Sequence, residues 1–162
     1  MKIFRLGVFI FLVYLLQVAV VSRFAIFSVR PDLMLVVITL IAVTQGVERG
    51  FASGFLGGLM QDVLGGMYFI NFLTKGLLGF LVGTFKESIF GSEESVAVTA
   101  VLVATVTEFV LQVLILSLFF DKPVATPLSL FLLLVISSVF NCAIAPILYP
   151  LIRASAPYFA EE

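Results

Sequence analysis

The chain has 162 residues, of which 62% are apolar and only 12% are charged, and its mean hydropathy is +1.24. Soluble domains are about half apolar and roughly a quarter charged, so this composition excludes a water-soluble domain and predicts a polytopic, all-α integral membrane protein. The net charge of −1 without a basic cluster excludes the electrostatic surface that nucleic-acid binding requires.

Charged residues and prolines divide the hydrophobic sequence into six segments, which we interpret as about six transmembrane helices in a single domain over residues 1–162. The first covers residues 4–22 and follows Lys2 and Arg5. Basic residues followed by an apolar stretch are also typical of a secretory signal. Because no small-residue cleavage motif follows, we interpret the segment as an uncleaved first helix.

The second segment, residues 32–45, is short for a complete crossing, so it should be tilted or matched to a thinned bilayer. Pro31 and Asp32 suit its start. Proline lacks an amide hydrogen that is unpaired there in any case, and aspartate complements the positive end of the helix dipole.

Four more segments follow. The third runs over residues 50–64 to a glycine turn, the fourth over 72–85, the fifth from acids near residue 93 to 120, and the sixth over 127–152. Pro146 and Pro150 should bend the sixth helix, because each removes a backbone donor.

Six crossings place both termini on one side of the membrane. That side carries five basic residues against four on the other, so the positive-inside rule predicts cytoplasmic termini in the bacterial inner membrane. The five are Lys2, Arg5, Arg49, Lys86 and Arg153, and the four are Arg23, Arg30, Lys75 and Lys122.

Small residues mark one face of the third segment and recur in the fourth. Lipid is as apolar as leucine, so helices in a bilayer associate through close packing and interhelical hydrogen bonds. We predict that these two segments pack on one another, with docking of a partner helix as the alternative. The residues are Gly50, Ser53, Gly54, Gly57, Gly58, Gly76, Gly79 and Gly83.

Asp62 lies one turn beyond Gly58 on the same stripe, so it should face protein rather than lipid. Lys75 opens the fourth segment at the same end of the bundle. We therefore predict an ion pair between Asp62 and Lys75.

Glu108 lies midway along the fifth segment, where a charged carboxylate costs at least ~2.5 kcal/mol. Gln112 follows one turn later, and Ser137, Ser138 and Asn141 form a polar stripe in the sixth segment. These side chains should form an inward polar centre. Glu108 is either a protonated carboxyl bonded to Asn141 or Gln112, or a group that binds a partner or ligand.

Catalysis has little support in the sequence. The chain has no histidine, so neither Cys142 nor a serine has an imidazole to activate it. The single cysteine excludes a disulfide or a cysteine metal site within the chain. We expect no enzymatic activity, no cofactor and no metal.

The arrangement resembles the MreD family of rod shape-determining membrane proteins over nearly the whole chain. Residues 67–71 depart from the family pattern, which usually has another glycine before the fourth segment. Four signatures carry the resemblance: Arg30-Pro31-Asp32-Leu33, the glycine-rich run 54–66 containing Asp62, the mid-helix acid Glu108, and Asn141 with Pro146 and Arg153 in the last segment.

The resemblance implies a fold similar to the S-components of energy-coupling-factor transporters. It also implies partners in bacterial cell-wall elongation: the single-span protein MreC, the glycosyltransferase RodA with its transpeptidase partner, and indirectly the MreB filament. The family is not known as an enzyme.

We therefore predict a scaffold in peptidoglycan synthesis whose glycine-lined grooves dock the transmembrane helix of MreC or of a synthase subunit. The alternative is an S-component-like subunit that captures a small molecule in a wet polar cavity. An ion-coupled carrier or channel that uses Glu108 is a third hypothesis. The small inward polar set and the absence of tryptophan favour the scaffold.

Overall fold

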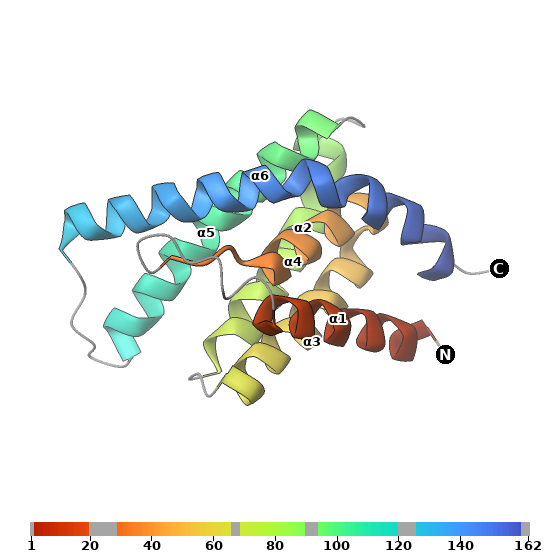
Figure 1. Cartoon of the computed structure of the whole chain (residues 1–162), viewed down its shortest axis with the longest axis horizontal. Coiled ribbons are helices and arrows are strands. Elements are labelled where there is room, and N and C mark those ends of the chain that lie inside the picture. The colour runs from red at the N-terminus through yellow and green to blue at the C-terminus, as the bar shows by residue number, and fades with distance from the viewer. Residues whose placement is uncertain (1, 20–28, 66–68, 90–93, 120–125, 160–162) are drawn as a thin grey trace.

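The computed structural model describes residues 2–19, 29–65, 69–89, 94–119 and 126–159. Within these ranges the chain forms six helices in one all-α bundle, as predicted (Figure 1). They are α1 (Lys2–Ala19), α2 (Leu33–Gln45), α3 (Val47–Gly65), α4 (Ile70–Ile89), α5 (Glu94–Phe119) and α6 (Pro127–Phe159). The glycine turn predicted after α3 falls largely outside the described residues.

Helix α2 lies in the middle of the bundle and contacts each of the other five helices. Asp32 caps it, as predicted, and its first ten residues are all buried. A helix that is apolar on every side must be surrounded by other elements. At 1.5 Å per residue, α2 is about 20 Å long, shorter than the hydrocarbon core of a bilayer. The sequence predicted its short length but not its central position.

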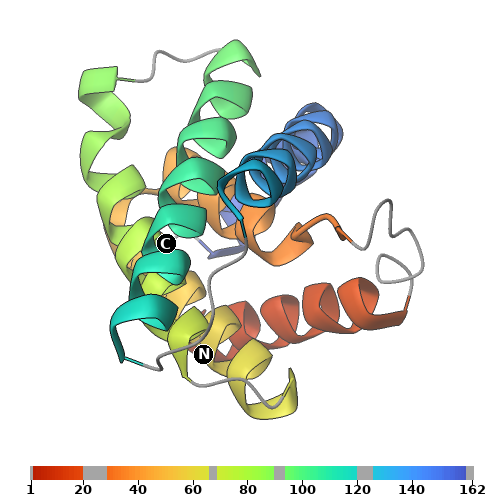
Figure 2. The ribbon, with the colours of Figure 1, turned by 90° about the vertical axis from the view of Figure 1, so that its left-hand side faces the viewer.

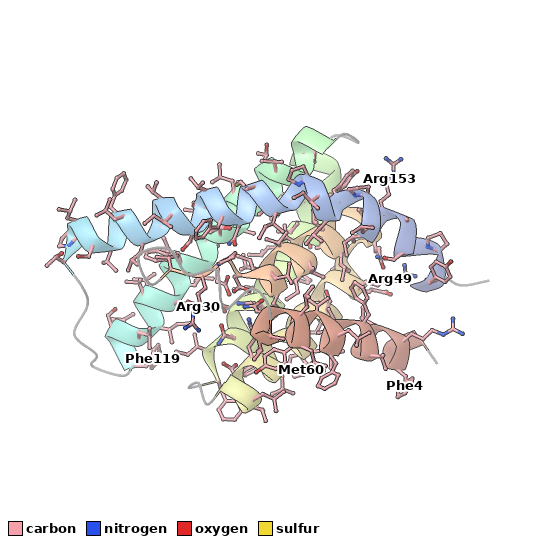
Figure 3. The ribbon with its side chains drawn as sticks, in the orientation of Figure 1. Phe4, Arg30, Arg49, Met60, Phe119 and Arg153 are labelled. Carbon is pink, nitrogen blue, oxygen red and sulfur yellow. The ribbon has the colours of Figure 1, made fainter. Side chains whose placement is uncertain are left out.

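Two helical stretches are long and apolar enough to cross a membrane, Val96–Phe119 in α5 and Pro127–Tyr158 in α6. Large apolar side chains also cover much of the exterior, and Figure 3 shows Phe4 and Phe119 on the outside of the bundle. Among the described residues, five charged or amide side chains are buried inside the bundle, namely Asp62, Asn71, Lys75, Glu108 and Asn141. This inverted distribution suits a surface that contacts acyl chains rather than water.

Helices α5 and α6 form a hairpin that projects beyond the other helices at one end of the molecule (Figure 1). Figure 2 views the molecule from that end, with α5 and α6 nearest the viewer and α1 to one side. Helix α6 continues to Phe159, beyond the predicted end at residue 152, because Pro146, Pro150 and Pro157 are accommodated inside it. Its C-terminal part turns away from the axis of its first part, as the prolines predicted (Figure 1).

Candidate functional site: a buried charged centre

Lys75 is the largest fully buried side chain in the described part of the chain. Its ammonium group lies 2.8 Å from Oδ2 of Asp32 and also pairs with Oε1 of Glu108. Asn71, one turn earlier on α4, accepts a further bond from Nζ at 3.4 Å. One lysine from α4 thus joins the start of α2 to the middle of α5. We call Asp32, Lys75 and Glu108 the charged triad.

The position of Asp32 follows from its role as the N-cap of α2. Its Oδ1 accepts from the Leu35 amide at 3.0 Å, which satisfies one of the unpaired donors in the first turn. Gln61 of α3 reaches the same oxygen at 3.5 Å. Because capping uses Oδ1, Oδ2 remains for Lys75.

Glu108 faces inward, as predicted, and only 5% of it is exposed. Gln112 donates one bond to Oε1 of Glu108 and another to Oδ1 of Asn71, each at 3.2 Å. Of the two hydrogen-bond partners that the sequence suggested for Glu108, Gln112 is bonded to it, whereas Asn141 bonds to Asp32 and Thr105. The ion pair with Lys75 was not predicted.

Asn141 connects α6 to this centre. Its Oδ1 accepts from the Asp32 amide at 2.9 Å, and its Nδ2 donates to Oγ1 of Thr105 at 3.1 Å. Thr105 in turn donates to the Val101 carbonyl at 2.8 Å. Asn141 therefore ties α6 to both α2 and α5, and its predicted place in the polar centre is confirmed.

The predicted ion pair between Asp62 and Lys75 is wrong. Both carboxylate oxygens of Asp62 bind the start of α4: Oδ1 accepts from the amide and the side chain of Asn71 at 3.2 and 2.8 Å, and Oδ2 accepts from the Phe72 amide at 2.8 Å. Because α4 begins at Ile70, these amides have no partner within the helix. Asp62 is buried, as predicted, but it caps a helix.

The glycine stripes bring the backbones of α3 and α4 into contact. A Cβ at Gly54 would collide with the backbone of Lys75, and one at Gly58 would collide with the backbone of Asn71. A Cβ at Gly50 would lie 2.5 Å from the carbonyl oxygen of Gly79. This close approach positions Lys75, and the predicted packing of these two segments is confirmed.

The remaining glycines are used in similar ways. A Cβ at Gly57 would lie 2.8 Å from Sδ of Met34 in α2, and one at Gly83 would lie 2.6 Å from Cα of Val47. Gly76 alone of the set would meet only ordinary contacts, the nearest at 3.7 Å. The chain's own helices therefore occupy these grooves, which corrects the prediction that a partner helix docks there.

A polar cavity of about 180 Å³ lies beside the charged triad. Arg30, Glu108, Gln112, Ser137 and Asn141 line it together with Asp32. Arg30 is exposed, and its guanidinium makes no hydrogen bond or ion pair with another described residue. Figure 3 shows it toward the end of the molecule from which α5 and α6 project. The cavity therefore brings polar groups of α5, of α6 and of the residues just before α2 to one place.

The sequence did not predict that three residues, Asp32, Asn71 and Lys75, belong to this centre. Lys75 and Asp32 were both singled out, but for an ion pair with Asp62 and for a helix start. Asn71 was included only in the range 67–71, which departs from the family pattern. A signal was nevertheless present, because a lysine one turn inside an apolar helix requires a buried anion.

The described residues contain no group of three metal-ligating side chains. The Cys142 thiol lies 3.9 Å from the Val98 carbonyl oxygen of α5. The role of the charged triad in this structure is electrostatic, because one ammonium group binds carboxylates from two other parts of the bundle and so holds three helices together.

Residues 2–155 match the family model of the rod shape-determining protein MreD. The matched range includes the charged triad, Asn141 and both glycine stripes. Comparison with curated proteins and with solved structures gave no match.

Proposed function

The chain belongs to the MreD family of rod shape-determining proteins, and from that premise we propose that it is a non-enzymatic scaffold of the cell-wall elongation machinery in the bacterial inner membrane. Membership of this membrane-protein family establishes a role in rod shape. The proposed mechanism is positional: the protein holds partner proteins by affinity between transmembrane helices, without bond chemistry.

We propose that all six helices cross the membrane. Helices α1, α3 and α4 have 18, 19 and 20 residues, close to the roughly 20 that a crossing needs. The short α2 is compatible with this topology, because its N-terminus meets Lys75 and Asn141 rather than lipid. Both described ends of the chain lie at the same end of the molecule, as an even number of crossings requires (Figure 1). The charge bias favours the cytoplasm for that end.

The surface that we propose for partner docking is an apolar groove between α5 and α6. Its volume is about 260 Å³. This groove is the observation that carries the proposal, because the glycine faces are already occupied by the chain itself. It is lined by Phe109, Val110, Val113 and Leu114 of α5 and by Leu130, Phe131 and Leu134 of α6.

The single transmembrane helix of MreC is the proposed occupant of this α5–α6 groove. RodA, its transpeptidase partner and, indirectly, MreB would assemble around the pair. In this arrangement the charged triad keeps α2, α4 and α5 in fixed positions, so that α6 and α5 present a constant surface.

The cavity gives little support to the alternative function, a transporter subunit that captures a small molecule. Sites for small molecules usually have roughly 300–1,000 Å³, and the polar cavity has about 180 Å³. A fold like that of the S-components remains a prediction of the family resemblance.

Affinity purification from membranes in mild detergent tests the scaffold. We expect an affinity-tagged full-length chain to recover a single-span protein with an extracytoplasmic coiled coil, together with the glycosyltransferase and transpeptidase. Recovery of an ATPase module with a transport subunit would contradict the proposal.

Two matched variants locate the interface. Val113→Trp fills the α5–α6 groove, whereas Leu77→Trp places the same ring on the exposed surface of α4. We expect the first variant to lose the single-span partner and the second to keep it. Equal recovery with both variants would place the interface elsewhere.

A further inference from the structure

The apolar α5–α6 groove adjoins the polar cavity. Phe109 lines both. On α6, Leu134 of the groove lies one turn before Ser137 of the cavity, and on α5, Val113 of the groove adjoins Gln112 of the cavity. The surface between the two helices therefore changes from apolar to polar near the middle of α5.

The charged triad lies at the polar end of this surface, and the exposed Arg30 is the other charged residue there. Asp32 and Glu108 share the single ammonium group of Lys75, so the charged triad has a net charge of −1. In surroundings of low dielectric such a charge attracts a cation strongly.

Part of Glu108 is available to meet that cation. Its Oε1 accepts from Lys75 and Gln112, whereas its Oε2 accepts no hydrogen bond from a described residue. Arg30 lines the same cavity, but its guanidinium is exposed and unpaired within the described ranges. The carboxylate therefore keeps an unused acceptor beside an open space.

We propose that the α5–α6 groove selects a partner helix that carries one basic side chain near the middle of an otherwise apolar transmembrane stretch. The apolar side chains of that helix fill the groove, and its lysine or arginine enters the cavity and pairs with Glu108. This inference rests on the proposed scaffold function and adds the chemistry by which the scaffold recognises its partner.

The energetics favour such selection. A basic side chain at the centre of a transmembrane helix costs roughly 2.5–3.5 kcal/mol on insertion scales when it faces lipid. A buried carboxylate at the same depth removes much of that cost, so the basic helix gains more from binding here than an apolar helix does. An acidic helix would meet Glu108 with like charge and be rejected.

Synthetic peptides give a direct test on the full-length protein. We would reconstitute it in vesicles of neutral phosphatidylcholine with fluorescent Leu/Ala transmembrane peptides whose central residue is Lys, Leu or Glu, and measure binding by energy transfer. We expect the Lys peptide to bind about tenfold more tightly than the Leu peptide, and the Glu peptide to bind least. This comparison requires no variant.

Two variants test the mechanism. Glu108→Gln keeps the shape and the ion pair of Lys75 with Asp32, and it should abolish the preference for Lys. Val113→Trp should weaken binding of the Lys and Leu peptides alike, because it fills the groove without changing the charge. Helical circular dichroism would confirm that each variant is folded.

Equal binding of the Lys and Leu peptides by the wild-type protein would overturn the inference. So would a preference for Lys that survives in Glu108→Gln, or one that arises only in Arg30→Gln, since Arg30 would then be the cation of the cavity. If the wild-type chain still recovers its single-span partner in these cases, only this inference fails. Selection of the Lys peptide without recovery of any such partner from membranes would instead contradict the proposed function.

Discussion

Lys75 of α4 and Glu108 of α5 form a buried ion pair at the centre of the bundle, and Asp32 at the start of α2 binds the same ammonium group at 2.8 Å. Residues 33 and 43 positions apart from Lys75 in sequence thus meet through one side chain. The relationship determines where three helices lie relative to one another.

Lys75→Met should lower the free energy of unfolding by about 3–5 kcal/mol, because it leaves two buried carboxylates without their cation. Unfolding in mixed micelles with increasing SDS, followed by circular dichroism, measures this. The triple variant Asp32→Asn, Lys75→Met, Glu108→Gln removes all three charges and should recover at least half of the loss. If Lys75→Met alone is as stable as the wild-type protein, the charged triad does not have this structural role.

Asp62→Ala should lower the free energy of unfolding by about 1 kcal/mol, since it removes the acceptors of the first amides of α4. The same SDS titration applies. In a double-mutant cycle, Asp62 should couple to Lys75 more weakly than Glu108 does. If Asp62 instead couples to Lys75 more strongly than Glu108 does, the ion pair between Asp62 and Lys75 that the sequence predicted would be supported.

Gly54→Ala should lower the free energy of unfolding by about 1–3 kcal/mol, because the added Cβ collides with the backbone of Lys75 and pushes α3 away from α4. Gly7→Ala is the matched control, since a Cβ there meets nothing within 4 Å. The control should be neutral or gain up to about 1 kcal/mol from helix propensity. Equal thermal stability of the two variants in detergent would show that α3 and α4 are not in close contact.

Asn141→Ala should lower the free energy of unfolding by about 1–3 kcal/mol, because the buried amide of Asp32 then lacks its acceptor. Ser138→Ala, on the same helix and without a hydrogen bond to the described residues, serves as the control. Hydrogen exchange at the start of α2 should accelerate in Asn141→Ala alone. Unchanged exchange there would mean that Asn141 does not tie α6 to α2.

The sequence was sufficient to predict the six helices and the inward direction of Asp62, Glu108 and Asn141. Hydrophobic segments bounded by charges and prolines have lengths that a bilayer imposes, and polar groups within them avoid lipid. Close packing of α3 on α4 also followed from composition, because glycines at a spacing of four residues leave room only for another backbone.

The pairing within the polar centre could not be predicted in the same way. Asp62 and Lys75 are near in sequence and lie in adjoining helices, yet Asp62 satisfies backbone amides that only the geometry of α4 reveals. The partners of Lys75 come from helices whose relative positions depend on the whole bundle. The central position of α2 could not be predicted for the same reason, because a short apolar segment has the same sequence pattern at the edge of a bundle and in its core.

Site-specific photocrosslinking in living cells tests the central claim, that partner docking occurs at the α5–α6 groove. A photoreactive phenylalanine would replace Leu134 in the groove or, as a control, Leu77 on the exposed surface of α4. We predict an adduct with a single-span membrane protein from position 134 and none from position 77. An adduct from position 77 alone would contradict the account, as would none from either position while the partner still co-purifies.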